Sequence, residues 1–448
     1  MSKKIVIIGA HAAGVDAASA CRKKDRTAEI ILITKEKHAG YSRCGLPFVI
    51  GGQIPNFEDL IVFSPAFYKM LKLNLKTETT VIEINRTNKN VSVIDKNGIS
   101  EILEYDKLII STGASPFLPR IKGYEKKGIM SLRTLEDGIQ IDQNVKEGAK
   151  TALIMGAGLI GLETGIGLHE RGLKVTIVEM LPQILPAMLD MDMANQVKET
   201  LVQKGLSILT EKRVEEILGE EKANGVIAGG EQINADILVS AFGVRANTKL
   251  AEDAKIAIGE TKAIKTNQRM ETNDADIFAA GDCAEVPNLI THQPSCSQLG
   301  TIAVRQGKVA GTNAGGGYAL FEGVLASAVT KLYDTEIGST GLTTTAAKRA
   351  KIETVSGKIS SKTRADYFPG AKPIKVKLVV EKESHRIVGS QIIGGEEVTQ
   401  RINALSFAIQ KNMTVNELAK ADTAYAPPLC ETWEPIVLAA EIALRKLG

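Results

Sequence analysis

Two stretches of the chain repeat one pattern of apolar and polar positions. Residues 3–36 and residues 150–180 each contain an apolar run, a glycine turn, a segment rich in alanine or glycine, and a second apolar run. Short continuous apolar runs predict buried strands, and the longer segment between them predicts a helix. The pattern therefore predicts two strand–helix–strand units of the kind that binds dinucleotides.

The second of these units carries a complete glycine fingerprint. Gly156, Gly158 and Gly161 lie in its turn, and Glu179 ends its second strand. The glycines let the backbone approach a pyrophosphate at the start of the helix. Glu179 can accept hydrogen bonds from an adenosine ribose and would repel a 2′-phosphate, and no arginine stands beside it in the sequence. We therefore expect NADH to bind here, with NADPH as the alternative.

The first unit departs from this fingerprint. Gly9 and Gly14 are present, but His11 replaces the middle glycine. The second apolar run ends at Thr34, so the expected acid is displaced to Glu36. We still expect this turn to bind a cofactor, with His11 next to the pyrophosphate and Glu36 among the binding residues.

Two further strand ends add to the first unit. Residues 105–116 end in a turn of small residues that contains Thr112 and Gly113, and residues 271–285 run into Gly281 and Asp282. An aspartate at a strand end, followed by the start of a helix, suits the ribityl hydroxyls and pyrophosphate of a flavin. These four residues are therefore predicted to bind FAD.

The pattern changes from about residue 318, where alternating strands and helical segments indicate an antiparallel sheet with helices. The fold class predicted for the whole chain is α/β, with two Rossmann-like nucleotide-binding domains and a C-terminal α+β domain. The expected boundaries are 1–115 and 245–317 for the FAD-binding domain, 116–244 for the NAD(P)H-binding domain and 318–448 for the C-terminal domain.

Composition excludes several classes of function. The 448 residues carry 55 basic and 52 acidic side chains, for a net charge of +3, which gives no basic face for nucleic acid. No apolar run is long enough to cross a membrane, and the N-terminus does not have the pattern of a signal peptide. The cysteines have no zinc-binding or paired spacing, so we expect no metal and a cytoplasmic location. They are Cys21, Cys44, Cys283, Cys296 and Cys430.

These features resemble the FAD-dependent pyridine nucleotide–disulfide oxidoreductases over essentially the whole chain. Residues 42–52, SRCGLPFVIGG, are similar to the single-cysteine branch, which contains coenzyme A disulfide reductases, NADH oxidases, NADH peroxidases and polysulfide reductases. The dithiol branch has a second cysteine shortly after the first, and residues 45–50 contain none. Residues 366–371, 400–409 and 423–429 resemble the dimer-forming domain of the single-cysteine branch. The resemblance implies a homodimer in which each C-terminal domain completes the partner's active site.

The resemblance also assigns a role to Cys44, which would lie against the flavin and relay electrons as a thiolate. Only the thiolate attacks a disulfide, and Arg43 or a helix N-terminus could stabilise it. A single redox cysteine must hold its oxidised state as a mixed disulfide with a small thiol, or as a sulfenic acid.

One sequence position distinguishes the disulfide reductases of this branch from its peroxidases and oxidases. Peroxidase and oxidase members resemble one another in a histidine of the first glycine loop, close to the cysteine. The matching position here is Ala12, counted among the cofactor-binding residues, and His11 lies one residue earlier. Coenzyme A disulfide reductases have a small or apolar residue at this position, so the chain resembles them most.

Disulfide reductases of this branch also use two tyrosines from the partner subunit, and these match Tyr367 and Tyr425. A phenol can hydrogen-bond or protonate a leaving thiolate, whereas interface packing is the structural alternative. We further expect Ser42, Arg43 and Lys23 to contact the substrate. Lys23 belongs to a short basic cluster that could meet a phosphate.

The predicted function is electron transfer from NADH through FAD and Cys44 to coenzyme A disulfide, another small disulfide or polysulfide. Trp433 and Glu434 weaken the coenzyme A assignment, because coenzyme A-specific members can place a basic residue in this region. One alternative is an NADH oxidase that reduces oxygen to peroxide or water. Another is a flavoprotein that delivers electrons to a protein partner, which the absence of an Fe–S cysteine set argues against.

Overall fold

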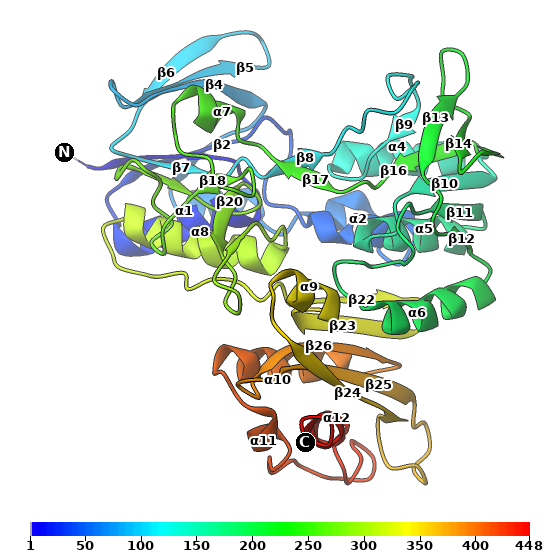
Figure 1. The fold of residues 1–448 in the computed structure, drawn as a ribbon. Coiled ribbons are helices and arrows are strands. Elements are labelled where there is room, and N and C mark those ends of the chain that lie inside the picture. Colours follow the sequence, from blue (N-terminus) through cyan, green and yellow to red (C-terminus); the bar gives the residue numbers. More distant parts are fainter. Residues whose placement is uncertain (1) are drawn as a thin grey trace. The chain divides into compact units, whose positions relative to one another are not determined.

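The protein is described here by a computed structural model that covers residues 2–448. The chain forms two compact units, and each is assembled from separate segments (Figure 1). The first unit contains Met1–Leu118, Arg133–Ile139 and Gly243–Val324. The second unit contains Pro119–Leu132, Gln140–Phe242 and Leu325–Gly448.

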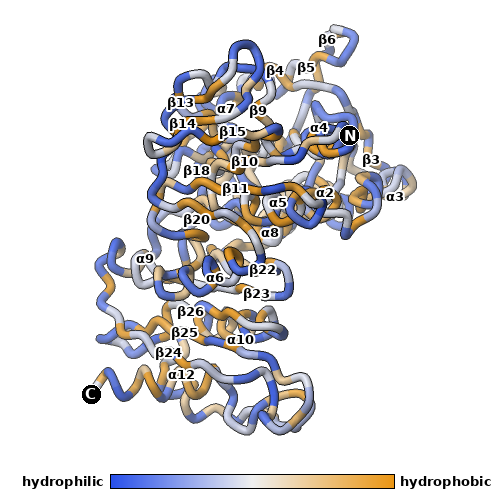
Figure 2. Tube along the Cα trace, turned by 90° about the vertical axis from the view of Figure 1, so that its right-hand side faces the viewer, coloured by the Kyte–Doolittle hydropathy of each residue, from blue (hydrophilic) through white to orange (hydrophobic). Residues whose placement is uncertain are grey.

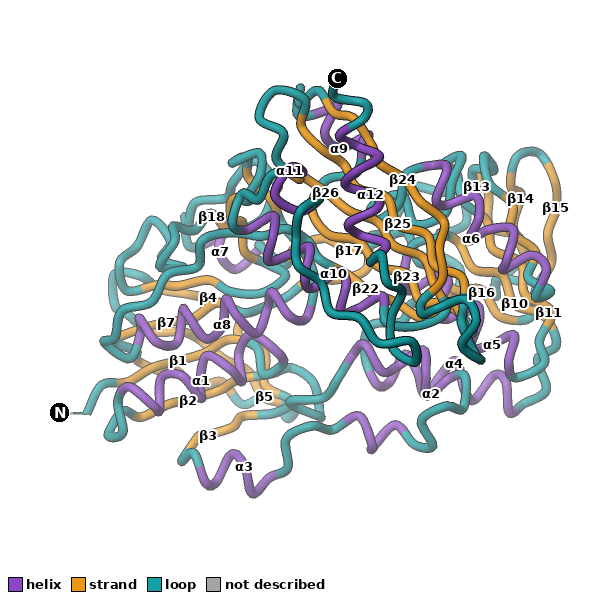
Figure 3. The backbone as a smooth tube through the Cα atoms, turned by 90° about the horizontal axis from the view of Figure 1, so that it is seen from below, coloured by secondary structure: helices purple, strands orange, loops and turns teal. Residues whose placement is uncertain are grey.

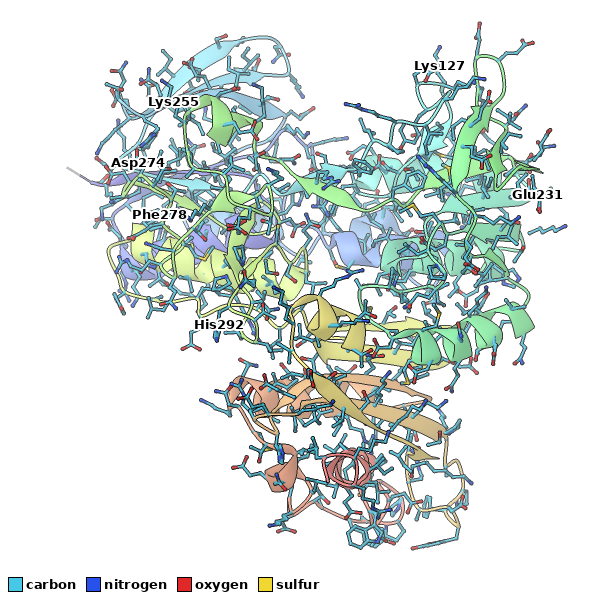
Figure 4. The ribbon with its side chains drawn as sticks, viewed as in Figure 1. Lys127, Glu231, Lys255, Asp274, Phe278 and His292 are labelled. Carbon is cyan, nitrogen blue, oxygen red and sulfur yellow. The ribbon has the colours of Figure 1, made fainter. Side chains whose placement is uncertain are left out.

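A parallel five-stranded sheet in the order β3-β2-β1-β7-β19 forms the core of the first unit. The chain winds to one side of β1 and then to the other, so β1 and β7 form the switch point at which such sheets bind ligands. Phe278 of β19, labelled in Figure 4, is among the largest fully buried side chains. The strands are β1 (Lys4–Ile8), β2 (Glu29–Ile33), β3 (Leu73–Lys76), β7 (Lys107–Ile110) and β19 (Ile277–Ala279).

Helices α1 (Ala12–Lys24) and α8 (Gly300–Ala314) lie side by side in the first unit, as Figures 1 and 3 show. Their backbones touch, because a Cβ added to Gly307 or to Gly311 would lie 2.1 Å from a carbonyl oxygen of α1. Small residues at this contact let α8 reach the turn from which α1 begins.

The other elements of the first unit are short. Their bounds are β4 (Thr79–Asn85), β5 (Asn90–Asp95) and β6 (Ser100–Glu104) in one antiparallel sheet; β8 (Ala114–Pro116) paired with β17 (Val244–Ala246); β18 (Ile264–Lys265), β20 (Ala284–Pro287) and β21 (Pro294–Ser295); helices α2 (Leu46–Ile50), α3 (Pro65–Met70) and α7 (Lys249–Asp253); and the 3₁₀ turns η1 (Arg43–Gly45) and η2 (Phe57–Leu60).

The second unit contains the other predicted strand–helix–strand segment, formed by β10, α5 and β11. Its parallel sheet has the order β12-β11-β10-β16-β9. The strands of this sheet are β9 (Ile129–Met130), β10 (Thr151–Met155), β11 (Lys174–Val178), β12 (Ser207–Leu209) and β16 (Ile237–Ser240). The helices are α5 (Leu159–Glu170), α6 (Met191–Gln203) and α4 (Leu135–Lys146), of which α4 has its first residues in the first unit and the rest in the second. A separate antiparallel sheet contains β13 (Val214–Leu218), β14 (Gly225–Ala228) and β15 (Glu231–Asn234).

The C-terminal part of the second unit is an antiparallel sheet in the order β22-β23-β26-β25-β24. Helix α12 crosses β24 and β25 in Figure 3 and is a hydrophobic segment in Figure 2. The bounds are β22 (Ala328–Leu332), β23 (Thr335–Gly341), β24 (Thr354–Lys362), β25 (Pro373–Glu381), β26 (Ile387–Gly394), α9 (Thr344–Arg349), α10 (Val398–Gln410), α11 (Val415–Leu418) and α12 (Pro435–Leu444).

The predicted fold class is confirmed. Both dinucleotide-type units have parallel sheets, and the C-terminal part is an antiparallel sheet with helices. Within residues 2–448, no helix has the length and apolar character that crossing a bilayer requires. In the same residues, no group of three or more His, Cys, Asp or Glu side chains could hold a metal ion.

Candidate active site

The residues predicted to bind the flavin meet at one edge of the parallel sheet in the first unit. Gly9 follows β1, Thr112 and Gly113 follow β7, and Gly281 and Asp282 follow β19. Because the carboxyl ends of parallel strands share one edge, residues more than 270 positions apart come together there. The structure therefore brings these predicted residues to one site.

The glycines of the β1–α1 turn are required by the geometry of the turn. Gly9 has a φ of +112°, and a Cβ added to it would lie 2.1 Å from the carbonyl oxygen of Ser111. A Cβ on Gly14 would lie 1.8 Å from the carbonyl oxygen of Gly9. Only glycine fits at both positions, so the turn lies directly against the end of β7 and leaves the start of α1 open to a pyrophosphate.

The polar groups around this turn fit an anionic dinucleotide such as FAD. Arg133 donates from Nη2 to Asp282 Oδ2 at 2.8 Å, while its Nε is buried and has no hydrogen-bond partner. His11 Nδ1 is also buried and unpaired. Such orphaned buried groups are costly unless a ligand completes them. The sequence did not reveal Arg133, whose segment, Arg133–Ile139, belongs to the first unit only through the tertiary fold.

Cys44 lies in the turn η1, immediately before α2, and it is exposed. A Cβ added to Gly300 would lie 4.0 Å from Cys44 Sγ. Gly300 is the first residue of the 15-residue helix α8, so the thiol lies beside a helix N-terminus, which favours a negative charge. The helix N-terminus expected near this cysteine is therefore that of α8, which lies more than 250 residues away in the sequence.

Arg43 is bonded to other residues of the first unit. Its Nη2 donates to Glu36 Oε1 at 2.5 Å, and its Nη1 donates to the carbonyl oxygen of Arg133 at 2.8 Å. The guanidinium also lies 5.5 Å from the ring centre of Tyr41. Its charge is largely balanced by Glu36, and a contact between Arg43 and substrate stays a prediction.

Glu36, in the loop after β2, and His11, in the β1–α1 turn, form a buried contact. Glu36 accepts a hydrogen bond from Tyr41 at 2.6 Å, and its Oε1 lies 3.2 Å from His11 Nε2. Burial alone would raise the pKa of Glu36, but His11, Arg43 and Tyr41 outweigh it and lower the pKa to about 2. Burial is the main cause that lowers the pKa of His11; the contact with Glu36 opposes this shift, and the nearby arginines Arg43 and Arg133 add to it.

The remaining predicted contact residues, Ala12, Ser42 and Lys23, lie in different parts of the first unit. Ala12 is the first residue of α1, next to the glycine turn. The backbone N–H of Ser42 donates to Leu60 O at 2.8 Å. Lys23 is exposed in the last turn of α1, about 16 Å along the helix axis from Ala12. Lys23 therefore lies at the opposite end of α1 from the glycine turn, and its contact with substrate stays a prediction.

The three glycines of the fingerprint in the second unit have two different roles. Gly156 has a φ of +116°, and a Cβ on Gly161 would lie 2.1 Å from the carbonyl oxygen of Gly156. A Cβ on Gly158, the N-cap of α5, would meet nothing within 4 Å. Gly158 therefore leaves room for a ligand, whereas the other two glycines shape the turn.

Glu179 is buried at the end of β11. Its carboxylate accepts hydrogen bonds from the N–H groups of Ala157 and Leu181, both at 2.8 Å. The N–H of Lys212 donates to the carbonyl oxygen of Glu179 at 3.0 Å, and Lys212 Nζ pairs with Glu231 at 2.9 Å. The sequence showed no arginine beside Glu179, but the fold brings Lys212 and the exposed Arg213 to this strand end.

Glu163, one turn along α5, contacts the C-terminal sheet. Its Oε1 accepts a hydrogen bond from Thr330 Oγ1 of β22 at 2.6 Å. Burial raises the pKa of this carboxyl, and the bond from Thr330 opposes the rise. Glu163 is thus a partly buried acid at the contact between α5 and β22.

The two tyrosines predicted near the active site form a pair in the second unit. Tyr367 lies between β24 and β25, Tyr425 lies between α11 and α12, and their hydroxyl oxygens are 2.8 Å apart. Both side chains are exposed, and the bond with Tyr425 raises the pKa of Tyr367. Cys430 bonds to the backbone on both sides of Tyr425, at Ala424 O (3.2 Å) and Ala426 N (3.3 Å).

Comparisons with known proteins agree with this arrangement. A model of the pyridine nucleotide-disulphide oxidoreductase family matches residues 3–307, and a model of the dimerisation domain of that family matches residues 327–436. The chain is 44% identical to a protein named NADH oxidase from Methanocaldococcus jannaschii, covering 99% of both chains. It is 30% identical to the coenzyme A disulfide reductase of Staphylococcus aureus, covering 95% of this chain and 96% of that protein.

Among solved structures, the NAD-dependent persulfide reductase from A. fulgidus is similar, with a TM-score of 0.96 and 38% identity. The match covers 99% of this chain and 83% of that one. The family models span both nucleotide-binding regions and the C-terminal sheet, and the relatives align over nearly the full length. The chain therefore belongs to the FAD-dependent pyridine nucleotide-disulphide oxidoreductases.

Proposed function

We propose that the protein transfers electrons from NADH, through FAD and Cys44, to a small-molecule disulfide or polysulfide, with coenzyme A disulfide as the first candidate. The observation that carries this proposal is the position of Cys44. The thiol is exposed, it lies beside the N-terminus of α8, and it belongs to the unit whose sheet edge fits the flavin dinucleotide. Relatives named coenzyme A disulfide reductase and persulfide reductase support the substrate class.

Different residues of the chain bind NADH and carry out the redox step. Gly158 leaves room for the NADH pyrophosphate, and Glu179 accepts hydrogen bonds from its ribose. FAD, which the residues after β1, β7 and β19 would hold, would supply two-electron redox chemistry between NADH and Cys44. Cys44, held as a mixed disulfide, takes up an electron pair, so its S–S bond breaks and a small thiol leaves with a proton.

The Cys44 thiolate then attacks the next disulfide. A new S–S bond forms to Cys44, and the second small thiol departs as a thiolate, which a tyrosine hydroxyl can protonate. The balance is one NADH, one proton and one disulfide converted to NAD⁺ and two thiols. For a polysulfide, the species leaving is the shortened sulfur chain.

The test compares four electron acceptors with the same preparation of holoenzyme. NADH turnover is measured with coenzyme A disulfide, polysulfide, oxygen and hydrogen peroxide in parallel. The proposal expects one of the sulfur acceptors to give the highest kcat/KM. Turnover that is fastest with oxygen and is not raised by either sulfur acceptor would contradict it.

The second candidate function is an NADH oxidase, and the relative from M. jannaschii with that name favours it. In the first unit, Ala12 stands at the position where oxidases and peroxidases of this family resemble one another in a histidine, and His11 is held by Glu36 and Tyr41. The lack of a histidine at the position of Ala12 supports sulfur chemistry, and the four-acceptor comparison distinguishes the two functions.

Nicotinamide choice gives a first prediction. Glu179→Ala should narrow the preference for NADH over NADPH by about tenfold, because the substitution removes the charge that repels a 2′-phosphate. The fold places Lys212 and Arg213 nearby, where they can attract that phosphate. The measurement is kcat/KM for both nucleotides. A wild-type protein that already prefers NADPH would show that Glu179 does not select the nucleotide.

The homodimer gives a second prediction. We infer that Tyr425 serves the Cys44 of the partner subunit, as the dimerisation domain supports. Mixing Cys44→Ser subunits with Tyr425→Phe subunits should then restore about a quarter of wild-type activity, since half of randomly mixed dimers hold one intact site.

Each variant alone must be nearly inactive for this experiment, and subunit exchange must be confirmed by native mass spectrometry. If exchange occurs and activity does not return, Tyr425 belongs to the site of its own subunit or lies outside catalysis.

A further inference from the structure

Glu36 does not occupy the place of the ribose-binding acid in its own nucleotide unit. In the second unit, the N–H of Glu179 donates to Leu209 O at 2.8 Å, at the end of the neighbouring strand. In the first unit, the N–H of Thr34 makes the same bond, to Lys76 O at 2.9 Å. Thr34 is therefore the equivalent of Glu179, and Glu36 lies two residues beyond it.

The carboxylate of Glu36 is turned inward and contacts three side chains. It accepts from Tyr41 at 2.6 Å and from Arg43 at 2.5 Å, and it lies 3.2 Å from His11 Nε2. Its side chain is only 13% exposed. The carboxylate is therefore committed to side chains of the first unit, and Glu36 lies two residues beyond the position that corresponds to the ribose-binding acid.

The partners of Glu36 belong to two loops with different roles. His11 is the N-cap of α1, in the turn that fits the pyrophosphate. Tyr41 and Arg43 belong to the segment that leads directly into Cys44. The ring of His11 also packs edge-on against Tyr41, with centres 4.7 Å apart. The charged side chain of Glu36 thus connects the dinucleotide turn to the segment that precedes Cys44.

We propose that Glu36 is a positioning residue, which holds the Cys44 segment against the dinucleotide turn through Tyr41, Arg43 and His11. In this role it keeps Arg43 neutralised and keeps the thiol in place for electron transfer. The effect on electron transfer rests on the proposed function of Cys44. The effect on the position of the Cys44 segment does not depend on that function.

The test is Glu36→Gln in the FAD-loaded enzyme. Glutamine keeps the size of the side chain and removes its charge, so Arg43 loses its ionic partner. After reduction with NADH, alkylation of Cys44 by iodoacetamide, followed by peptide mass spectrometry, should become about fivefold faster. The released Arg43 favours the thiolate, and the loosened segment exposes it. NADH should reduce the flavin at a rate within about twofold of wild type, because the NADH site is untouched.

Two comparisons make the result specific. If Glu36 acts through Arg43, Arg43→Met and the double variant Glu36→Gln/Arg43→Met should alkylate at equal rates. Glu271→Gln is the matched control, because Glu271 is also partly buried and pairs with an arginine, Arg269, at 2.8 Å. This control should leave alkylation of Cys44 unchanged.

The possible outcomes separate the alternatives. Loss of FAD on Glu36→Gln, with unchanged alkylation of the remaining holoenzyme, would make Glu36 a cofactor ligand and overturn the proposal. Should Glu36→Gln fail to fold, Tyr41→Phe removes one of the three contacts and should still speed alkylation by about twofold. No change in that variant would also overturn the proposal. Alkylation does not require turnover, so this result is independent of whether Cys44 relays electrons.

Discussion

Cys44→Ser is expected to lower disulfide and polysulfide reduction by about a thousandfold or more, while NADH still reduces the flavin at the wild-type rate. Serine is nearly the size of cysteine, so packing around η1 is preserved. Its hydroxyl does not ionise at neutral pH and cannot form a disulfide, so the electron path beyond the flavin is removed. Stopped-flow absorbance measures flavin reduction, and steady-state assays measure the loss with each acceptor.

Cys21→Ser is the matched control for this variant. Cys21 is buried in α1 and donates to Gly311 O at 3.1 Å, a bond that serine can keep, so activity should remain. Oxygen turnover in Cys44→Ser should persist or rise, because the preferred electron exit is closed. The wild-type protein as isolated should carry a small thiol or sulfur adduct on the Cys44 peptide. Disulfide reduction at the wild-type rate in Cys44→Ser would leave this cysteine with only a structural role.

Gly14→Val is the second variant with a large expected effect. A Cβ at this position would lie 1.8 Å from Gly9 O and 2.9 Å from Ser111 Oγ, so α1 must move away from the turn. Such overpacking costs about 1–3 kcal/mol, and the displaced turn can no longer hold the pyrophosphate. FAD bound per chain should fall by about tenfold or more, as absorbance of the purified protein will measure.

Gly158→Ala is the control for glycine replacement. It adds a methyl group where nothing lies within 4 Å, so folding and FAD content should be unchanged and only the KM for NADH should rise. Normal FAD content in Gly14→Val would show that the β1–α1 turn does not hold the flavin.

Much of the nucleotide-binding framework was predictable from sequence, because it depends on local patterns. The apolar runs and glycine spacing of β10, α5 and β11 predict a strand–helix–strand unit, and that unit is present. The same reasoning found Thr112 and Asp282 at strand ends, since a strand followed by small residues is visible within about ten positions. Parallel pairing then brings these ends to a single edge.

The contacts that set the chemistry could not be predicted in this way. Arg133 reaches Asp282 across 149 positions, and Gly300 meets Cys44 only because α8 packs on α1. The direction of the Glu36 side chain depends on partners in two loops, whereas its sequence position suggested a ribose ligand. Spacing along the chain carries no information on such contacts, which depend on tertiary packing and on charge balance in a partly buried site.

The discontinuity of the first unit has a consequence for synthesis of the chain. Its N-terminal segment ends at Leu118, but β19, which completes the sheet, begins about 160 residues later, which is about 8–30 s of translation, and α8 follows β19. During that interval the edge of β7 and the face of α1 that α8 covers have no partner. A nascent chain stopped before Ile277 cannot close this core, so such fragments should depend on chaperones or aggregate.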